Sequence, residues 1–154
     1  MLRLSRRTDY AVRVMLVVAS VPEGVHIPTA QVGEQMLIPQ PFLVKVIGDL
    51  KRAGLVTTTA GRGGGLRIMR PAETITLRHI VEAVEGPISL NFCLMRPGEC
   101  EFDQICPVHP VWQHIQGVLN QELDAVNLAT LSNVSVEIGY LNQQQALSDG
   151  DKSL

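Results

Sequence analysis

Residues 40–70 read QPFLVKVIGDLKRAGLVTTTAGRGGGLRIMR, and this stretch decides the fold. Residues 41–52 carry apolar side chains at helical spacing, and Gly54 suits a helix C-terminal cap. Residues 55–59 are rich in β-branched side chains and predict a strand, while residues 66–70 alternate apolar and basic side chains and predict the return strand. The glycine-rich segment between them predicts a tight turn, so a helix is expected to lead directly into a β-hairpin.

Two more helices are predicted upstream. Apolar residues recur at helical spacing over about residues 5–20, and a second, shorter helix is expected over about 28–37. The second helix and the helix at 41–52, joined by a short turn, match a helix-turn-helix. Because a β-hairpin follows, the pattern favours a winged helix over a plain helical hairpin, and the expected fold is mainly α with one small hairpin.

The distribution of charge supports a role in binding DNA. Residues 1–70 hold ten Lys/Arg and four Asp/Glu, a net charge of +6, whereas residues 71–154 hold three and eleven, a net charge of −8. A basic N-terminal half fits a nucleic-acid partner although the whole chain is slightly acidic. The residues expected at double-stranded DNA are Gln40, Lys45 and Lys51 on the helix and Arg62, Gly63, Gly64 and Arg67 in the wing.

The glycine run could also suggest a phosphate-binding loop. No Lys-Ser/Thr pair follows it, however, and the strand–loop–helix order of a P-loop is missing. The wing is therefore the better interpretation of this segment.

Three cysteines, Cys93, Cys100 and Cys106, lie within 14 residues, and the chain has no other cysteine. An odd count without a preceding secretory signal points to a metal or redox site in a reducing compartment. Thiolates are soft ligands for iron–sulfur clusters or zinc. The gaps of six and five residues are wider than usual zinc spacing and favour a cluster, although zinc held by the three cysteines and His109 remains an alternative.

The sequence resembles the winged-helix repressor family of NsrR and IscR. The resemblance rests on residues 4–11 (LSRRTDYA), 43–47, 50–56 and the wing glycines, and it covers about residues 1–132. It implies a homodimeric regulator with an iron–sulfur cluster, four-iron preferred and two-iron as the alternative, held by the three cysteines. The opening Thr8-Asp9-Tyr10 is nearer to NsrR than to IscR.

The resemblance also offers two fourth ligands. Asp9 matches the NsrR type, in which such a carboxylate reaches the cluster of the partner subunit. His109, three residues past Cys106, matches the IscR type. The NsrR reading implies nitric oxide or redox sensing through control of operator binding; the alternative in the same family is sensing of iron or cluster supply.

A last helix is expected from about residue 108 to 131, with an apolar stripe that needs a partner, and a second copy of the chain is the expected one. The expected organisation is a winged helix-turn-helix domain at 1–75, a connecting helix and cysteine loop at 76–106, a dimerisation helix at 107–132 and a flexible tail at 133–154.

The remaining expectations are negative or alternative. No apolar run is long enough for a membrane span, so no membrane partner and a cytoplasmic location are expected. No nucleophile–base spacing or carboxylate pair suggests an enzyme. From another class of protein, a zinc-stabilised interaction module is the competing reading.

Overall fold

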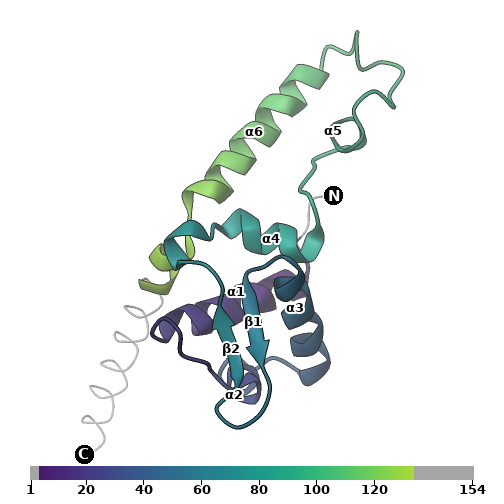
Figure 1. The fold of residues 1–154 in the computed structure, drawn as a ribbon. Helices are drawn as coiled ribbons and strands as arrows, with labels where there is room; N and C mark the ends of the chain where they lie inside the picture. Colours follow the sequence, from purple (N-terminus) through teal and green to yellow (C-terminus); the bar gives the residue numbers. More distant parts are fainter. Residues whose placement is uncertain (1–3, 134–154) are drawn as a thin grey trace, which may run out of the picture.

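The computed structural model describes residues 4–133 of the chain. All of the predicted tail except Asn133 therefore lies outside the described residues. Over these described residues the chain is mainly helical with one two-stranded antiparallel sheet, as the sequence predicts (Figure 1). In chain order the elements are α1 (Arg6–Ser20), α2 (Thr29–Gln35), α3 (Gln40–Arg52), β1 (Val56–Thr59), β2 (Gly65–Ile68), η1 (Ala72–Thr74), α4 (Leu77–Glu85), α5 (Phe92–Met95) and α6 (His109–Ala125).

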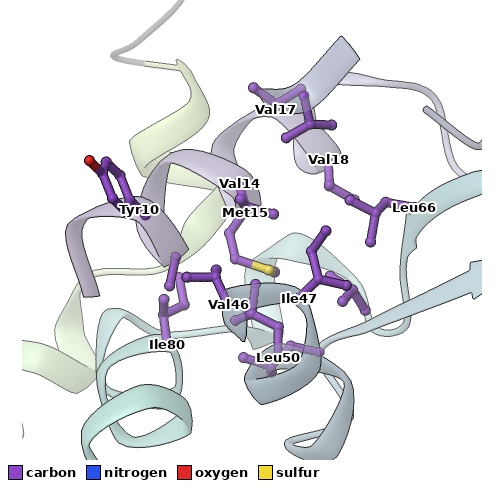
Figure 2. Close-up of a cluster of buried hydrophobic side chains, with 14 of the residues drawn as sticks. Tyr10, Val14, Met15, Val17, Val18, Val46, Ile47, Leu50, Leu66 and Ile80 are labelled. Carbon is purple, nitrogen blue, oxygen red and sulfur yellow. The ribbon is translucent and has the colours of Figure 1, made fainter. Parts of the chain in front are cut away.

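The core lies between α1, α3, α4 and the hairpin. The stripe predicted on α1 is buried, with Val14, Met15 and Val18 fully covered. Figure 2 shows these side chains directed toward those of α3, among them Val46 and Leu50. Aliphatic side chains at helical spacing thus fix α3 in place by one face and leave its opposite face outside the core.

The predicted hairpin is formed by β1 and β2, and one isolated bridge joins it to the segment before α2. Val56 lies opposite Ile68, and Thr59 lies opposite Gly65. Beyond β2, Ile27 and Leu66 exchange backbone hydrogen bonds of 2.9 and 2.8 Å. The extended segment before α2 is therefore tied to the wing, which anchors the wing to the helical core.

Helix α6 ends earlier than predicted. It stops at Ala125 rather than near residue 131, because Val126 is extended and accepts a 2.8 Å hydrogen bond from the backbone NH of Leu77. Leu128 then donates to the carbonyl of Ile75 at 2.8 Å and is fully buried. A straight helix could not have brought Leu128 into the core, so the chain bends back before a further helical turn begins.

The rest of α6 projects away from the winged helix, with the cysteine loop near its far end (Figure 1). None of its 17 residues is buried. Val111, Trp112, Ile115 and Val118 are exposed along one stripe. Within residues 4–133, no helix combines the length and apolar character that crossing a membrane would require.

Candidate functional site

The outward face of α3 has the character expected of a DNA-reading helix. Gln40, Val44 and Lys45 are exposed, whereas Leu43, Val46 and Ile47 are buried against the core. Lys45 forms no ion pair with any residue between 4 and 133. Its charge is therefore free to meet a phosphate.

The wing tip carries Arg62 in the solvent. Gly61 and Gly63 flank it with φ of 90° and 77°, and the NH of Gly64 closes the turn on the carbonyl of Gly61 at 3.0 Å. Gly63 has open space around it, as a contact with DNA requires. A Cβ on Gly64 would lie 2.1 Å from the carbonyl oxygen of Thr59, so Gly64 is also needed for closing the hairpin.

Two other predicted contacts have roles within the fold. The Lys51 ammonium donates a 2.8 Å hydrogen bond to the Thr58 hydroxyl and so joins α3 to β1. Arg67 lies opposite Thr57 and lines a pocket of about 260 Å³ together with Arg70, away from the Gly61–Gly64 turn. A DNA contact stays a prediction for both residues. Of the two, Lys51 has the clearer structural role, because its hydrogen bond joins α3 to β1.

A buried carboxylate ties α1 to α3. Asp49 is only 6% exposed and accepts hydrogen bonds from the guanidinium groups of Arg7 and Arg52. Arg7 lies in the first turn of α1, so this pair fixes the start of α1 against α3. A buried carboxylate without such partners would carry a large desolvation cost.

A second connection runs from α1 toward the cysteine loop. The backbone NH of Ser5 donates to Glu85 Oε1 at 2.9 Å, and the Thr8 hydroxyl donates to the same oxygen. Hydrogen bonds from Ser5 and Thr8 hold the pKa of the Glu85 carboxyl below its ordinary value. Glu85 is the last residue of α4, and the loop that carries the cysteines begins just after it.

The cysteine loop opens with a short helix. Asn91 caps α5 through its side chain, which accepts from the NH of Leu94, and the Cys93 thiol donates to the same oxygen at 3.3 Å. Cys93, Cys100 and Cys106 are all half-buried, and none is in a disulfide. Three free thiols shielded in part from water suit ligation of a soft metal.

The structure brings Cys93 together with Asp103 and His109. Their ligand atoms all lie within 4.8 Å of one another, and both partners are largely buried. Asp103 Oδ1 and His109 Nδ1 are 3.3 Å apart, yet neither has a hydrogen-bond partner within residues 4–133. Buried polar atoms are normally satisfied, so two unsatisfied atoms beside a thiol fit a site that takes a metal.

Cys100 and Cys106 are near Asp103 and His109 in sequence, but their thiols are not part of the group formed by Cys93, Asp103 and His109. The carbonyl of Cys100 accepts from the NH of Asp103 at 3.1 Å, and the carbonyl of Cys106 accepts from the NH of His109 at 3.2 Å. No compact group of three metal-ligand side chains within the described residues includes either thiol. The structure therefore places Cys93 with Asp103 and His109 and does not bring the three cysteines into one group, so their joint ligation stays a prediction.

The sequence analysis did not identify Asp103 as a candidate metal ligand. In the sequence it was one of three acids in a polar loop, and nothing separated it from Glu99 and Glu101. Its second oxygen accepts from the NH of Gly98 at 2.8 Å, which holds the carboxylate toward His109.

Asp9 does not join the cysteine loop of its own chain. It lies in the first turn of α1, 55% exposed, and pairs with Arg13 at 2.7 Å. It also lines a shallow pocket of about 430 Å³ between α1 and α4. Its carboxylate is accessible to a second protein chain, which the predicted role across subunits requires.

Comparison with known proteins gives a consistent assignment. The model of the Rrf2 family, described as an iron-dependent transcriptional regulator, matches residues 4–134. CymR, the global cysteine regulator of B. subtilis, is similar in structure with a TM-score of 0.70 and 23% identity, over 87% of this chain and 98% of that one. IscR of T. potens has a TM-score of 0.65 and 22% identity, over 87% and 88% of the two chains.

CymR of Staphylococcus aureus is also similar, with a TM-score of 0.62 and 23% identity over 83% of this chain and 96% of that chain. At these identities the solved structures establish the shared fold, while the family model covers most of the chain. The predicted resemblance and fold class are confirmed; the preference for NsrR over IscR stays a prediction. The chain belongs to the Rrf2 family of transcriptional regulators.

Proposed function

We propose that this regulator binds operator DNA as a homodimer under the control of an iron–sulfur cluster held by Cys93, Cys100 and Cys106. The observation that supports a metal in this loop is the pair of buried, unsatisfied atoms of Asp103 and His109 beside the Cys93 thiol, while the three-cysteine ligand set rests on the sequence. The description of the family as iron-dependent supports iron over zinc. As in the sequence-based expectation, a four-iron cluster is preferred over a two-iron one.

The fourth ligand is proposed to be Asp9 of the partner subunit. Its exposure on α1 supports a reach across subunits, and in the single chain its carboxylate pairs only with the neighbouring Arg13 among residues 4–133. His109 is the second candidate, because its Nδ1 already lies in the donor group of its own loop. A cluster with three thiolate ligands and one oxygen or nitrogen ligand offers an accessible iron to a small molecule, and nitric oxide is the preferred signal.

The contacts on either side of α1 support a link from the loop to DNA. Glu85 at the end of α4 holds Ser5 and Thr8, and Arg7 beside them holds Asp49 of α3. A displacement of the cysteine loop that moves α4 therefore acts on the first turn of α1 and on the DNA-reading helix. Two such helices must lie about one DNA turn apart, so a small rotation is enough to lose a half-site.

The homodimer is supported by α6. None of the 17 residues of α6 is buried, and its contacts with its own chain include polar ones made by Gln116 and Asp124, so its exposed apolar stripe suits a second copy. A two-fold dimer through α6 would contain two cysteine loops and would present two winged helices to the two half-sites of a symmetric operator.

The first experiment is the visible spectrum of anaerobically purified protein together with iron and sulfide analysis. Cluster absorption is expected, and each of Cys93→Ala, Cys100→Ala and Cys106→Ala should lose it. Full iron and sulfide in any one variant would remove that cysteine from the ligand set. Zinc in place of iron, in colourless protein, would favour the zinc-stabilised module instead.

The second experiment is operator binding before and after nitric oxide, for wild type, Asp9→Ala and His109→Ala. His114→Ala is the matched control, since His114 is an exposed histidine on α6 outside the donor group. Wild type is expected to lose about 100-fold in affinity, a coupling of about 2.7 kcal/mol. Whichever of Asp9→Ala and His109→Ala removes the fourth ligand should lose less operator affinity on exposure to nitric oxide than wild type does. Equal binding by apo-protein and holo-protein would contradict cluster control, and a response to iron depletion alone would favour sensing of iron supply.

A further inference from the structure

One line of residues along the outer face of α3 has a composition that the fold itself does not require. Gln40, Val44 and Gly48 follow one another at intervals of four residues, so they lie one turn apart on the same side of the helix. Val44 is 60% exposed, and a Cβ on Gly48 would meet nothing within 4 Å. The line therefore presents an amide, a branched apolar group and a bare stretch of backbone.

Val44 contributes nothing to the core. Its neighbours Leu43 and Val46 are fully buried and directed toward α1, as Figure 2 shows for Val46. A β-branched residue in the middle of a helix also has a lower helix propensity than alanine. One exposed valine is ordinary on a protein surface, so the surroundings of Val44 must decide whether it has a partner.

The residues around Val44 suit a negatively charged partner that also presents a small apolar group. The single acid of α3, Asp49, is turned inward and paired with Arg7 and Arg52, so it places no negative charge on the outer face. Lys45 lies beside Val44, and the wing with Arg62 follows α3 in the chain. A cationic side chain next to an exposed apolar one fits DNA better than an apolar protein surface.

In the major groove, the 5-methyl group of thymine is the apolar group on the base edges, and a glutamine amide pairs best with adenine. Four helical residues advance about 6 Å, and base pairs are about 3.4 Å apart, so Gln40 and Val44 can face base pairs one or two steps apart. We propose that Val44 packs on a thymine methyl group in each operator half-site, next to an adenine read by Gln40. Gly48 lets the helix backbone approach the groove.

This inference rests on the proposed operator binding, and its test separates the two. Anaerobically purified full-length wild type, Val44→Ala and Val25→Ala would each select binding sites from a pool of duplexes with a randomised centre. Alanine is a better helix former than valine, so Val44→Ala should fold. Val25→Ala is the matched control, because Val25 has a comparable exposure of 44% and lies in the loop between α1 and α2.

Each thymine of the selected site would then be replaced singly by uracil, which removes only the methyl group. At one position per half-site, uracil should weaken binding of wild type and Val25→Ala by about fourfold, the affinity equivalent of burying one methyl-sized group. Val44→Ala should bind the thymine and uracil duplexes equally and should select no base at that position.

The inference is overturned if wild type is indifferent to uracil everywhere, or if Val44→Ala keeps the same sensitivity and the same selected base. In either case specific enrichment by wild type would leave operator binding intact. If wild type enriches no sequence, operator binding itself fails and takes the inference with it.

Discussion

At the scale of single residues, the two faces of α3 have opposite electrostatic tasks. Asp49 is buried and faces inward, where it holds the start of α1 through Arg7. Lys45 faces outward and forms no ion pair within residues 4–133. Because the acid is neutralised inside the fold, it does not repel the phosphates that the outer face is proposed to meet.

Removal of the Asp49 carboxylate should destabilise the protein. Asp49→Ala leaves the half-exposed Arg7 without its partner, and partial access to water should hold the loss to about 1–3 kcal/mol. Arg52→Ala is the control: Arg52 contacts the same carboxylate but is mostly exposed, so about 0.5 kcal/mol is expected. Urea unfolding of both variants measures the difference, and equal losses would contradict the structural role of the Arg7 pair.

Glu85 should make stability depend on pH. Its pKa in the folded chain is lowered by hydrogen bonds from Ser5 and Thr8, so the unfolded chain binds the proton more readily. The resulting stabilisation is present above the ordinary glutamate pKa of about 4.3 and is lost as the pH falls through the lower folded value.

The check is the free energy of unfolding of apo-protein between about pH 3 and pH 7, for wild type and Glu85→Gln. The advantage of wild type over Glu85→Gln should shrink below about pH 4.3. Glu82→Gln serves as a control on the same helix, since Glu82 instead pairs with Arg78 at 3.0 Å. A constant difference across the range would show that Glu85 titrates alike in both states.

How far single residues could be predicted depended on whether their signal was local. The three cysteines stand out by chemistry alone, and the candidate ligand His109 stands out by its closeness to Cys106. The place of Asp103 depends on how the loop folds back onto Cys93, and the burial of Asp49 depends on Arg7, which is 42 residues away. Contacts of that range leave no trace in local composition.

At the scale of elements, local patterns were sufficient for the helices and the hairpin but not for the end of α6. The hairpin was predictable because β-branched strands and a glycine turn are neighbours in sequence. The break at Val126 was not, because its cause is the pairing of Val126 and Leu128 with Leu77 and Ile75. Helical periodicity continues across the break and conceals it.

The glycines of the wing should differ sharply in tolerance. Gly65 has φ of 142°, and a Cβ there would lie 2.2 Å from the carbonyl oxygen of Ile27. Gly65→Ala should therefore separate the wing from that segment and cost more than about 2 kcal/mol, with strain and lost hydrogen bonds adding. Gly63→Ala, with positive φ but open space, should cost about 1–2 kcal/mol.

Thermal unfolding of the two variants checks this order, and a loss for Gly63→Ala as large as for Gly65→Ala would contradict it. Because Gly63→Ala should remain folded, it also tests the predicted DNA contact at Gly63. Weaker operator binding by folded Gly63→Ala would support close approach of the wing backbone to DNA.

At the scale of the whole molecule, one core joins the winged helix to α4 and Leu128, whereas the arm formed by α6 and the cysteine loop lies outside that core. The winged helix has a continuous core, and α6 buries no residue. The loop at the far end of this arm leaves Phe102 and Ile105 exposed beside the half-buried cysteines. The proposed metal site thus lies on the part of the chain that most needs a second copy, so assembly and ligation are expected to depend on each other.

Disruption of the α6 stripe should test this dependence. Ile115→Glu places a charge in the middle of the exposed stripe, and a two-fold interface would carry that charge twice. The dimer dissociation constant should rise by about 100-fold or more, measured by sedimentation at several protein concentrations. Gln113→Glu adds the same charge at an exposed position on the opposite side of α6 and should stay dimeric.

The visible spectrum of the monomeric variant then distinguishes the two proposed fourth ligands. If Asp9 of the partner subunit is the ligand, a monomer has no carboxylate at the fourth iron position, and the anaerobic spectrum should change together with the loss of dimer. If His109 is the ligand, the donor group lies within one chain and the spectrum should survive dissociation. Operator binding should fall in both cases, because one winged helix reaches only one half-site. A dimer that persists in Ile115→Glu would rule out the α6 stripe as the interface.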